Sequence, residues 1–569
     1  MEAAEGQRGR DGGSQRRSPF DVIMSQIRRK RSASDRKPLG RFLSRTSERT
    51  AIPEDAESEN RGQSPGAAAP VESQRDAGWG RVCVFLQKLG KKADSSSLSL
   101  AHCDLTATDL LELASLLQFL PQLEEMDVSW NELIGGSLTA LTSHLQHVGG
   151  IRTLKLCSCR LNADDVAALG EALPSLPVLE ILDLSWNSSV GGALQSLLGK
   201  LQPSVRELHL VACELTAADA AALGGLVAVL PKLCVLDVSC NPRLTQEVDA
   251  GGFGQLAASL SHAVSLTVLR LQACGLRPDN LEALGASLRC LPSVRHLDLS
   301  CNRSLTGGLS RLSSHLPHMA HLESLDLHLC RLKRADLEAL IQVLPSLTAL
   351  AALDVSSNKE AGGAVHQLVS VLPLTQMRRL PMSSCRLTEE SFTALALVAP
   401  YLRSLDVSWC KVVGGRLPLL MDALQPSVVL ELRLSSCGLT TDDLGHLADV
   451  CRRGCVSSLR VLDLSYNDSV GDAGWAALFA AGGLGSLEEA DLSLRPLTSA
   501  PCSAWLPSLL GALPRMPALA RLAMQRWSAG PQEEQQLRFS VKNRNIRLDW
   551  DPDGSDWKTS SQEDSQAEE

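Results

Sequence analysis

Cysteine and asparagine are the residues whose number and spacing first suggest chemistry in this sequence. The chain has 17 cysteines, and a cysteine thiolate can bind zinc or act as a nucleophile. Cys157 and Cys159 form a close pair, but no histidine lies at zinc-ligand spacing from them. Seven cysteines instead share one recurring place with six asparagines, directly after a leucine-rich phrase. These residues are Cys103, Asn131, Cys159, Asn187, Cys213, Asn241, Cys274, Asn302, Cys330, Asn358, Cys385, Cys437 and Asn467.

This regular ladder predicts a structural role. An asparagine amide can hydrogen-bond the backbone of an adjacent turn, and a thiol fills the same place more weakly. We therefore expect no disulfides and no metal site. The sequence also contains none of the patterns G-x-S-x-G, H-E-x-x-H or G-x-x-x-x-G-K-[ST]. We expect a protein that is not an enzyme and that uses no cofactor.

The ladder belongs to an internal repeat that runs from about residue 82 to 530. The phrase L-x-L-x-x-C-x-L alternates with L-D-L-S-W-N, and the distance from Cys103 to Asn131, and again to Cys159, is 28 residues. About 16 such half-repeats follow one another. In each, L-x-L predicts a short strand and the stretch after it, for example 164–173, predicts a helix.

Stacking these half-repeats predicts an α/β solenoid. Parallel strands stack about 4.8 Å apart, whereas packed helices need roughly 8–10 Å. The mismatch should bend the stack into a horseshoe with a parallel sheet on the concave face and helices on the convex face.

One side chain between the two leucines of each strand should face solvent on the concave surface. In chain order these are Asp127, Lys155, Asp183, His209, Asp237, Arg270, Asp298, Asp326, Asp354, Pro381, Asp406, Arg433, Asp463, Asp491 and Arg521. The first six alternate acid and base and can pair laterally, as exposed pairs of small energetic value. Asp298, Asp326 and Asp354 break the alternation and predict a negative patch for a basic partner.

Aromatic residues gather just before the asparagine place, although they make up only 3% of the chain. The residues there are Trp130, Trp186, Cys240, Cys301, Ser357, Trp409 and Tyr466. An aromatic ring at such a strand end can pack on the neighbouring turn, or it can present an interface hot spot. Both interpretations of Trp130, Trp186, Trp409 and Tyr466 stay open.

The two ends of the chain differ from the repeats in composition. Residues 1–80 are basic and then acidic and lack periodicity, and 531–569 end in an acidic tail at 551–569, so we expect 1–80 and that tail to be disordered. The cluster Arg28–Arg31 could serve nuclear import, bind acidic surfaces, direct phosphorylation of Ser32 or Ser34, or have no specific role. With no signal-peptide pattern and no membrane-spanning run, we expect a cytoplasmic protein, with nuclear import left open.

The 28-residue period with alternating Cys and Asn resembles the ribonuclease-inhibitor subfamily of leucine-rich-repeat proteins. The resemblance covers about 450 residues, and it implies the horseshoe fold and a protein-binding role in which rim aromatics grip the partner. It implies no catalytic residues. Other members of that subfamily carry a nucleotide-switch module, for which this chain lacks the phosphate-binding loop.

We therefore expect a scaffold or adaptor that binds a partner protein on the concave face and rim, as an inhibitor if it follows the resembled family. Two alternatives remain. One is an activator of small GTPases, which in some leucine-rich-repeat proteins uses an arginine or asparagine on a rim loop. The other is a nucleic-acid adaptor that uses the basic N-terminal region, although the net charge of −9 makes nucleic acid a poor match for the body of the protein.

Overall fold

A computed structural model of the chain describes residues 71–197, 199–246 and 251–551. The chain divides into two units, Met1–Ala68 and Ala69–Glu569, and the described residues belong to the second. The basic cluster, Ser32 and Ser34, and residues 552–569 lie outside the described residues. The first helix among the described residues begins at Val71, so the described structure includes ten residues that the sequence assigned to the N-terminal region.

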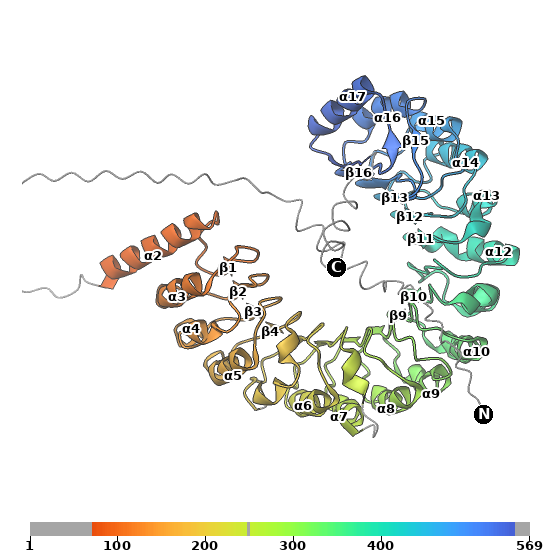
Figure 1. Cartoon of the computed structure of the whole chain (residues 1–569). Coiled ribbons are helices and arrows are strands. Elements are labelled where there is room, and N and C mark those ends of the chain that lie inside the picture. The colour runs from red at the N-terminus through yellow and green to blue at the C-terminus, as the bar shows by residue number, and fades with distance from the viewer. Residues whose placement is uncertain (1–70, 198, 247–250, 552–569) are drawn as a thin grey trace, which may run out of the picture. The chain divides into compact units, whose positions relative to one another are not determined.

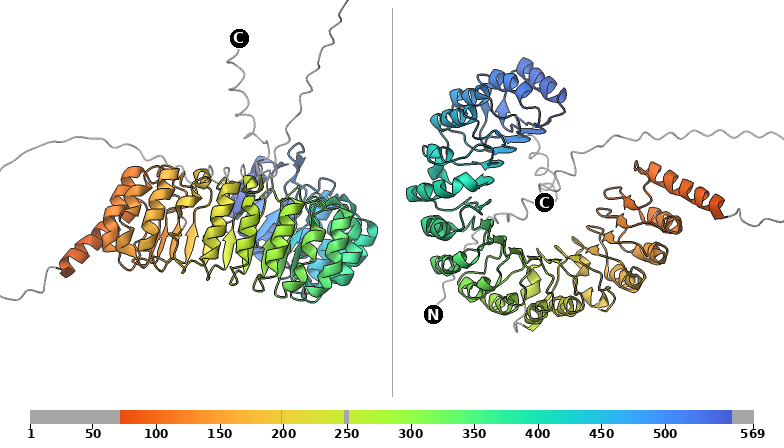
Figure 2. Two further views of the ribbon diagram at one scale, coloured as in Figure 1. Left: turned by 90° about the horizontal axis from the view of Figure 1, so that it is seen from below. Right: turned by 180° about the vertical axis from the view of Figure 1, so that it is seen from behind.

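Most half-repeats form a strand of three residues followed by a helix or a 3-10 turn, and the second unit curves as an arc (Figure 1). The strands line the inner side and the helices the outer side, as Figure 2 shows from below and from behind. The α/β leucine-rich-repeat horseshoe expected from the sequence is thus confirmed.

The helices described are α2 (Val71–Lys88), α3 (Ala107–Leu116), α4 (Leu138–Thr142), α5 (Ala163–Ala172), α6 (Ala217–Ala228), α7 (Gly251–Leu260), α8 (Pro278–Leu288), α9 (Leu309–Ser313), α10 (Arg334–Val343), α11 (Val365–Val371), α12 (Glu389–Val398), α13 (Leu417–Met421), α14 (Thr441–Arg452), α15 (Asp472–Ala481), α16 (Leu506–Ala512) and α17 (Pro531–Lys542).

The strands described are β1 (Ser97–Ser99), β2 (Glu125–Asp127), β3 (Thr153–Lys155), β4 (Ile181–Asp183), β5 (Glu207–His209), β6 (Val235–Asp237), β7 (Val268–Arg270), β8 (His296–Asp298), β9 (Ser324–Asp326), β10 (Ala352–Asp354), β11 (Ser404–Asp406), β12 (Glu431–Arg433), β13 (Val461–Asp463), β14 (Glu489–Asp491), β15 (Ala500–Pro501), β16 (Arg521–Ala523), β17 (Trp527–Ser528) and β18 (Arg547–Asp549).

The strands pair in parallel and in chain order. Within the described residues, β1 to β10 form one sheet, and β11 to β14 continue with β16 and β18 as a second. The half-repeat between them contributes only bridges through Arg379. Pro381 occupies the third strand position there and is buried, and because proline lacks an N–H it cannot donate to the ladder. The expectation that Pro381 faces solvent is therefore wrong.

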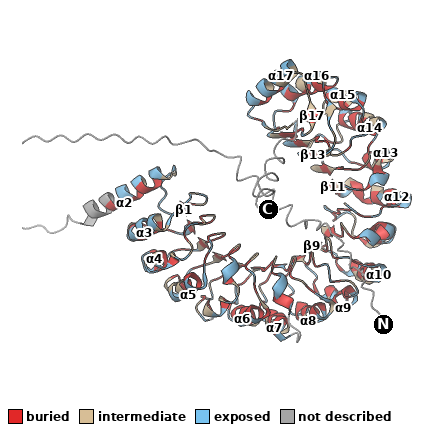
Figure 3. Cartoon of the chain, in the orientation of Figure 1, coloured by how far each residue is buried: buried red, intermediate tan, exposed pale blue. Residues whose placement is uncertain are grey.

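Leucines of the L-x-L phrases form one continuous aliphatic core between the sheet and the helices. Leu154, Leu182 and Leu208, on successive strands, are completely buried. Figure 3 shows buried residues between strands and helices and exposed ones mainly on the outer faces of the helices. The strands are only three residues long, so their stability depends on this packing between neighbours.

Buried asparagines close the turns after β2, β4, β6, β8, β10 and β13, as the sequence predicted. Asn187 donates through Nδ2 to the carbonyls of Leu156 and Leu184, both at 2.8 Å, and accepts through Oδ1 from the N–H groups of Cys159 and Leu161. In the intervening half-repeats a thiol takes this place, and Cys213 Sγ lies 3.3 Å from the carbonyl oxygen of Leu184. The ladder therefore fixes the direction in which each strand-end turn leaves the sheet.

Buried aspartates join the starts of α5, α6, α10 and α14 to the preceding half-repeat. Asp165 caps α5 together with Asn162, and its carboxylate also accepts from the backbone N–H of Gly136 at 2.6 Å. The Asp164-Asp165 and Asp442-Asp443 pairs thus lie at helix starts, as expected. The half-repeats also approach each other closely: a Cβ added to Gly191 would lie 2.2 Å from the carbonyl oxygen of Glu214, so only glycine fits there.

No helix in the described ranges is both long enough and apolar enough to cross a membrane.

Candidate functional site

The rim of the concave face is built from strand-end turns with left-handed backbone. Trp130, Trp186 and Trp409 each have φ of 63°, and Tyr466 has φ of 61°. The backbone N–H of each residue donates at 2.7 Å to a carbonyl two residues beyond the end of the next strand. Since the main chain is held in this way, the position of the side chain at the rim follows from the fold.

Trp409 and Tyr466 form an aromatic pair that follows β11 and β13. Their ring centroids lie 5.9 Å apart, and 56% of Trp409 is exposed. Tyr466 is more covered, and burial, followed by the charges of Asp491 and Asp463, raises the pKa of its hydroxyl. The pair combines a mostly exposed indole with a second, more covered ring beside it.

Trp130 and Trp186 follow β2 and β4, towards the other end of the arc, and both are partly buried. Trp130 stacks on His102 with ring centroids 5.4 Å apart and an interplanar angle of 9°. The four aromatics that the sequence singled out therefore fall into two groups, and only Trp409 among them is mostly exposed. The rim places between the groups hold the smaller Cys240, Cys301 and Ser357.

The row of concave-face residues follows the strand register expected from the sequence through Asp354. Asp127, Lys155 and Asp183 are partners on adjacent strands, and so are Asp298, Asp326 and Asp354. The register differs at the far end, where Ala523 lies opposite Asp491, and Arg521 lies in the neighbouring row opposite Glu489. Placing Arg521 in the concave row was therefore an error of two residues.

Lateral pairing in this row is less extensive than its charge alternation suggested. Arg270 pairs with Asp237 at 3.3 Å. His209 contacts Glu207 on its own strand at 3.1 Å, and Lys155 makes no ion pair with any residue that the structure describes. The aspartates are held locally instead: Asp183 Oδ1 accepts from the backbone N–H of Ser185, two residues on. The recurring D-x-S phrase was the sequence signal for this turn.

Asp298, Asp326 and Asp354 do form a row of acids, but the row is partly neutralised. Asp354 pairs with Arg379 at 3.6 Å, which corrects the expectation of three uncompensated acids. Arg379 was missed because it occupies the first strand position, two residues before Pro381; the two-residue period of a strand puts both positions on one face.

Asp326 lies between the two other carboxylates and has no cation of its own among the described residues. Burial, followed by the charges of Asp354 and Asp298, raises its pKa from 3.8 to about 7. The backbone N–H of His328 donates to it at 2.9 Å and opposes this change. A cationic side chain from a partner would be attracted to this position, because it would neutralise a carboxylate that is costly to ionise.

A loop near Tyr466 was also missed in the sequence. Arg495 takes the place that asparagine fills elsewhere, and its guanidinium reaches Ser436 Oγ at 3.0 Å and Asp468 at 3.6 Å. Leu497, two residues later, is 95% exposed. In the sequence, this loop could have been found from residues 494–497, Leu-Arg-Pro-Leu, which depart from the repeat consensus.

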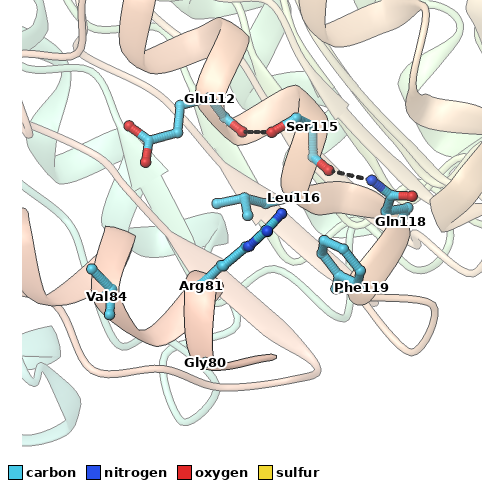
Figure 4. A pocket seen from close by; sticks show the side chains of 8 residues that line it. All are labelled: Gly80, Arg81, Val84, Glu112, Ser115, Leu116, Gln118 and Phe119. Atoms are coloured by element: carbon cyan, nitrogen blue, oxygen red, sulfur yellow. Dashed lines mark hydrogen bonds between the residues drawn. The ribbon is translucent and has the colours of Figure 1, made fainter. Parts of the chain in front are cut away.

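The arrangement offers no constellation for catalysis or metal binding among the described residues. No group of three or more potential metal ligands occurs there. An open pocket of about 620 Å³ lies between α2 and α3 (Figure 4). The side chains of Ser115 and Gln118 in its wall bond only to backbone carbonyls of α3. Its remaining polar groups, Arg81 and Glu112, form no nucleophile–base pair.

All 17 cysteines are within the described residues, and each is a free thiol there. Burial raises the pKa of the ladder thiols, for example that of Cys159 to about 12. A thiol with so high a pKa is a poor nucleophile and a poor metal ligand at neutral pH.

Comparison with known proteins agrees with this architecture. A family model described as "Leucine Rich repeat" matches residues 457–479. Ribonuclease inhibitor of Sus scrofa is 30% identical over 439 residues, which cover 75% of this chain and 92% of that protein.

Two further likenesses are more limited. NACHT, LRR and PYD domains-containing protein 5 of Homo sapiens is 31% identical over 223 residues, 38% of this chain and 18% of that protein. Among solved structures, the yeast Rad7 and Elc1 complex has a chain that matches at 13% identity with a TM-score of 0.40, covering 94% of this chain and 98% of that one. By its match along nearly the whole ribonuclease inhibitor, this chain belongs to the ribonuclease-inhibitor family of leucine-rich-repeat proteins.

Proposed function

We propose that the chain is a non-enzymatic scaffold that binds a partner protein against its concave face and rim. The observation that carries the proposal is the Trp409–Tyr466 pair, because a mostly exposed indole is held in place by a second ring and by a fixed backbone turn. Rigid, partly exposed aromatics at the edge of a concave surface are typical hot spots of protein interfaces.

The partner segment that reaches the concave face should be basic. Asp298, Asp326 and Asp354 lie side by side. Arg379 pairs with Asp354, and Arg270, opposite Asp298 in register, pairs with Asp237. A lysine or arginine placed at Asp326 would replace solvent as the neutralising group, which favours a basic partner and disfavours an acidic one. Binding should therefore weaken as pH falls through about 7, where Asp326 takes up a proton.

Whether binding inhibits the partner is a further part of the proposal. The relatives are named for inhibition of ribonuclease, and a concave face that covers a partner's surface can block its active site. The wider sequence also resembles leucine-rich repeat-containing protein 31, and a cytoplasmic location is consistent with a ladder of free thiols.

The test compares capture of partners by the intact chain and by rim variants. Trp409→Ala combined with Asp326→Asn should lose partners that the intact chain retains at pH 8, whereas Leu419→Ala, at a half-exposed position on α13, should retain them. A ribonuclease, tested directly for binding and for loss of RNA cleavage, examines the inhibitory role. Equal capture by the rim variant and by Leu419→Ala would refute the proposed site, and stimulated GTP hydrolysis by a captured GTPase would favour the activator function.

A further inference from the structure

A second row of residues runs along the opposite edge of the sheet, where the strands begin. Its backbone forms a continuous hydrogen-bonded ladder: the N–H of each row residue donates to the carbonyl of the row residue before it. The row contains Glu124, Arg152, Glu180, Arg206, Cys234, Thr267, Arg295, Glu323, Ala351, Arg378, Arg403, Leu430, Arg460 and Glu488. Neighbours in this row therefore lie one strand spacing apart, close enough for side chains to pair.

Most arginines of the row are neutralised by a glutamate in the row. Arg152 contacts Glu124 and Glu180, and Arg206 also contacts Glu180. Arg295 pairs with Glu323 and Arg460 with Glu488 in the same way. This pattern makes the two remaining arginines exceptional.

Arg378 and Arg403 are adjacent in the row, and neither forms an ion pair with a described residue. The Arg378 guanidinium is held by the backbone carbonyls of Thr375 and Met377, at 2.8 and 2.9 Å. Arg403 is exposed, and its side chain has no hydrogen bond within the described chain. Acids on the neighbouring strands have other partners: Asp354 pairs with Arg379, and Glu431 with Arg433.

The two arginines line one open pocket of about 420 Å³, beside the end of α12. Its lining contains no acidic residue, and it contributes three hydroxyl side chains, from Thr375, Tyr401 and Ser427. In a chain with net charge −9, a pocket with two unneutralised guanidinium groups and three hydroxyls is a concentrated set of hydrogen-bond donors. Such a set matches an anion with several acceptor oxygens.

We propose that this pocket binds a phosphate monoester carried by a side chain of a partner protein. A phosphate monoester brings close to two negative charges and three acceptor oxygens, which two arginines and the hydroxyls can satisfy together. A carboxylate brings one charge and fills one guanidinium. A phosphorylated lipid headgroup is the weaker match, because membrane surfaces are held by clusters of about four to eight basic residues, and the acid-free lining of this pocket holds two.

The site is independent of the concave face, so each can fail without the other. The pocket lies at the edge where the strands begin, and the aromatic rim lies at the edge where they end. A partner could engage both edges, but nothing in the pocket requires Trp409 or Asp326.

Fluorescence anisotropy with short labelled peptides tests the proposal on the full chain. The probe has a central phosphoserine, and matched peptides carry serine or glutamate there. Arg403→Gln should raise the dissociation constant for the phosphoserine peptide at least tenfold, without loss of folding, since this side chain makes no described hydrogen bond. Arg206→Gln is the matched control, because its guanidinium belongs to the same row but pairs with Glu180. The serine and glutamate peptides should bind at least tenfold more weakly than the phosphoserine peptide.

Several results would overturn the proposal. These are absence of binding by the unaltered chain, equal affinity for the glutamate peptide, or an unchanged dissociation constant in Arg403→Gln. A final experiment measures binding of the unaltered chain and of Arg403→Gln to vesicles that contain a phosphorylated inositol lipid. If Arg403→Gln abolishes vesicle binding while the phosphopeptide does not bind, the pocket serves a lipid and the assignment to a protein partner is wrong.

Discussion

Replacement of Asp326 by asparagine should stabilise the folded protein at alkaline pH. Asp326 is flanked in register by Asp298 and Asp354, and Arg379 contacts the latter. His328 faces it only through its backbone N–H, because the imidazole bonds Ser356 Oγ at 2.8 Å. Ionised Asp326 is therefore a destabilising charge in the absence of a partner, and asparagine removes it while keeping an acceptor for the His328 N–H.

The magnitude follows from the pKa of this carboxyl. A folded-state pKa of about 7 against an ordinary value of 3.8 corresponds to roughly 4 kcal/mol when each pH unit is worth about 1.4 kcal/mol. Solvent near this partly exposed side chain screens the repulsion, so we expect about 2–4 kcal/mol at pH 8.

The sign is fixed by proton uptake. Between pH of about 4 and about 7, the folded state holds a proton on Asp326 that the unfolded state has released. The Asp326 contribution to stability therefore falls as pH rises through this interval and is constant above it. The advantage of Asp326→Asn should be near zero at pH 4, grow towards pH 7, and level off by pH 8.

Urea unfolding at a series of pH values measures this difference, with fluorescence of the buried tryptophans Trp475 and Trp505 as the signal. Asp183→Asn is the control, because Asp183 has the same local bond to Ser185 but has bases on both neighbouring strands. Burial also raises the pKa values of Asp406 and Asp491, so the test rests on the difference between variants. A stability difference from the unaltered chain that stays constant between pH 5 and 8 would refute the reasoning.

Three further predictions concern the rim and the ladder. Trp409→Ala should weaken partner binding by about 2 kcal/mol or more. Trp475 is 1% exposed, so Trp475→Ala should instead lower the free energy of unfolding by roughly 3–5 kcal/mol. If thermal unfolding and binding assays gave the reverse ranking, the rim assignment would be contradicted. Asn187→Ala leaves two buried N–H groups without their acceptor and should cost about 2–6 kcal/mol in urea unfolding; a change below 1 kcal/mol would show that water replaces the amide. Thiol titration of freshly denatured, unreduced protein should count close to the 17 cysteines of the sequence; several missing thiols would mean disulfides.

The fold could be predicted from the sequence because the same pattern of leucine, cysteine and asparagine recurs in successive half-repeats. The 28-residue spacing between Cys103 and Asn131 reappears as the hydrogen bond from the N–H of Cys103 to Asn131 Oδ1, one half-repeat apart. A single sequence period therefore encoded both the strand stacking and the turn that follows each strand. In such an architecture each repeat contacts only its neighbours, so few structural features depend on residues far apart in the sequence.

The features that the sequence did not predict arise where neighbouring half-repeats differ. Pro381 was read as one more member of the concave row, but without an N–H it interrupts the ladder. Arg379 could be matched to Asp354 only after the register across that interruption was known. Arg521 was misplaced because its repeat has lost the leucine-rich phrase that sets the register elsewhere.

The rim aromatics show why a fold can be evident while its binding surface is not. Trp186, Cys240 and Ser357 occupy equivalent turns with φ of 63°, 62° and 59°, so one backbone geometry accepts an indole, a thiol and a hydroxyl. The turn is held by main-chain bonds that do not depend on the side chain. Packing therefore does not dictate which residue stands there. The exposed indole of Trp409 is then not needed to build the turn. We expect it to contribute instead to the binding of a partner protein that contacts the rim.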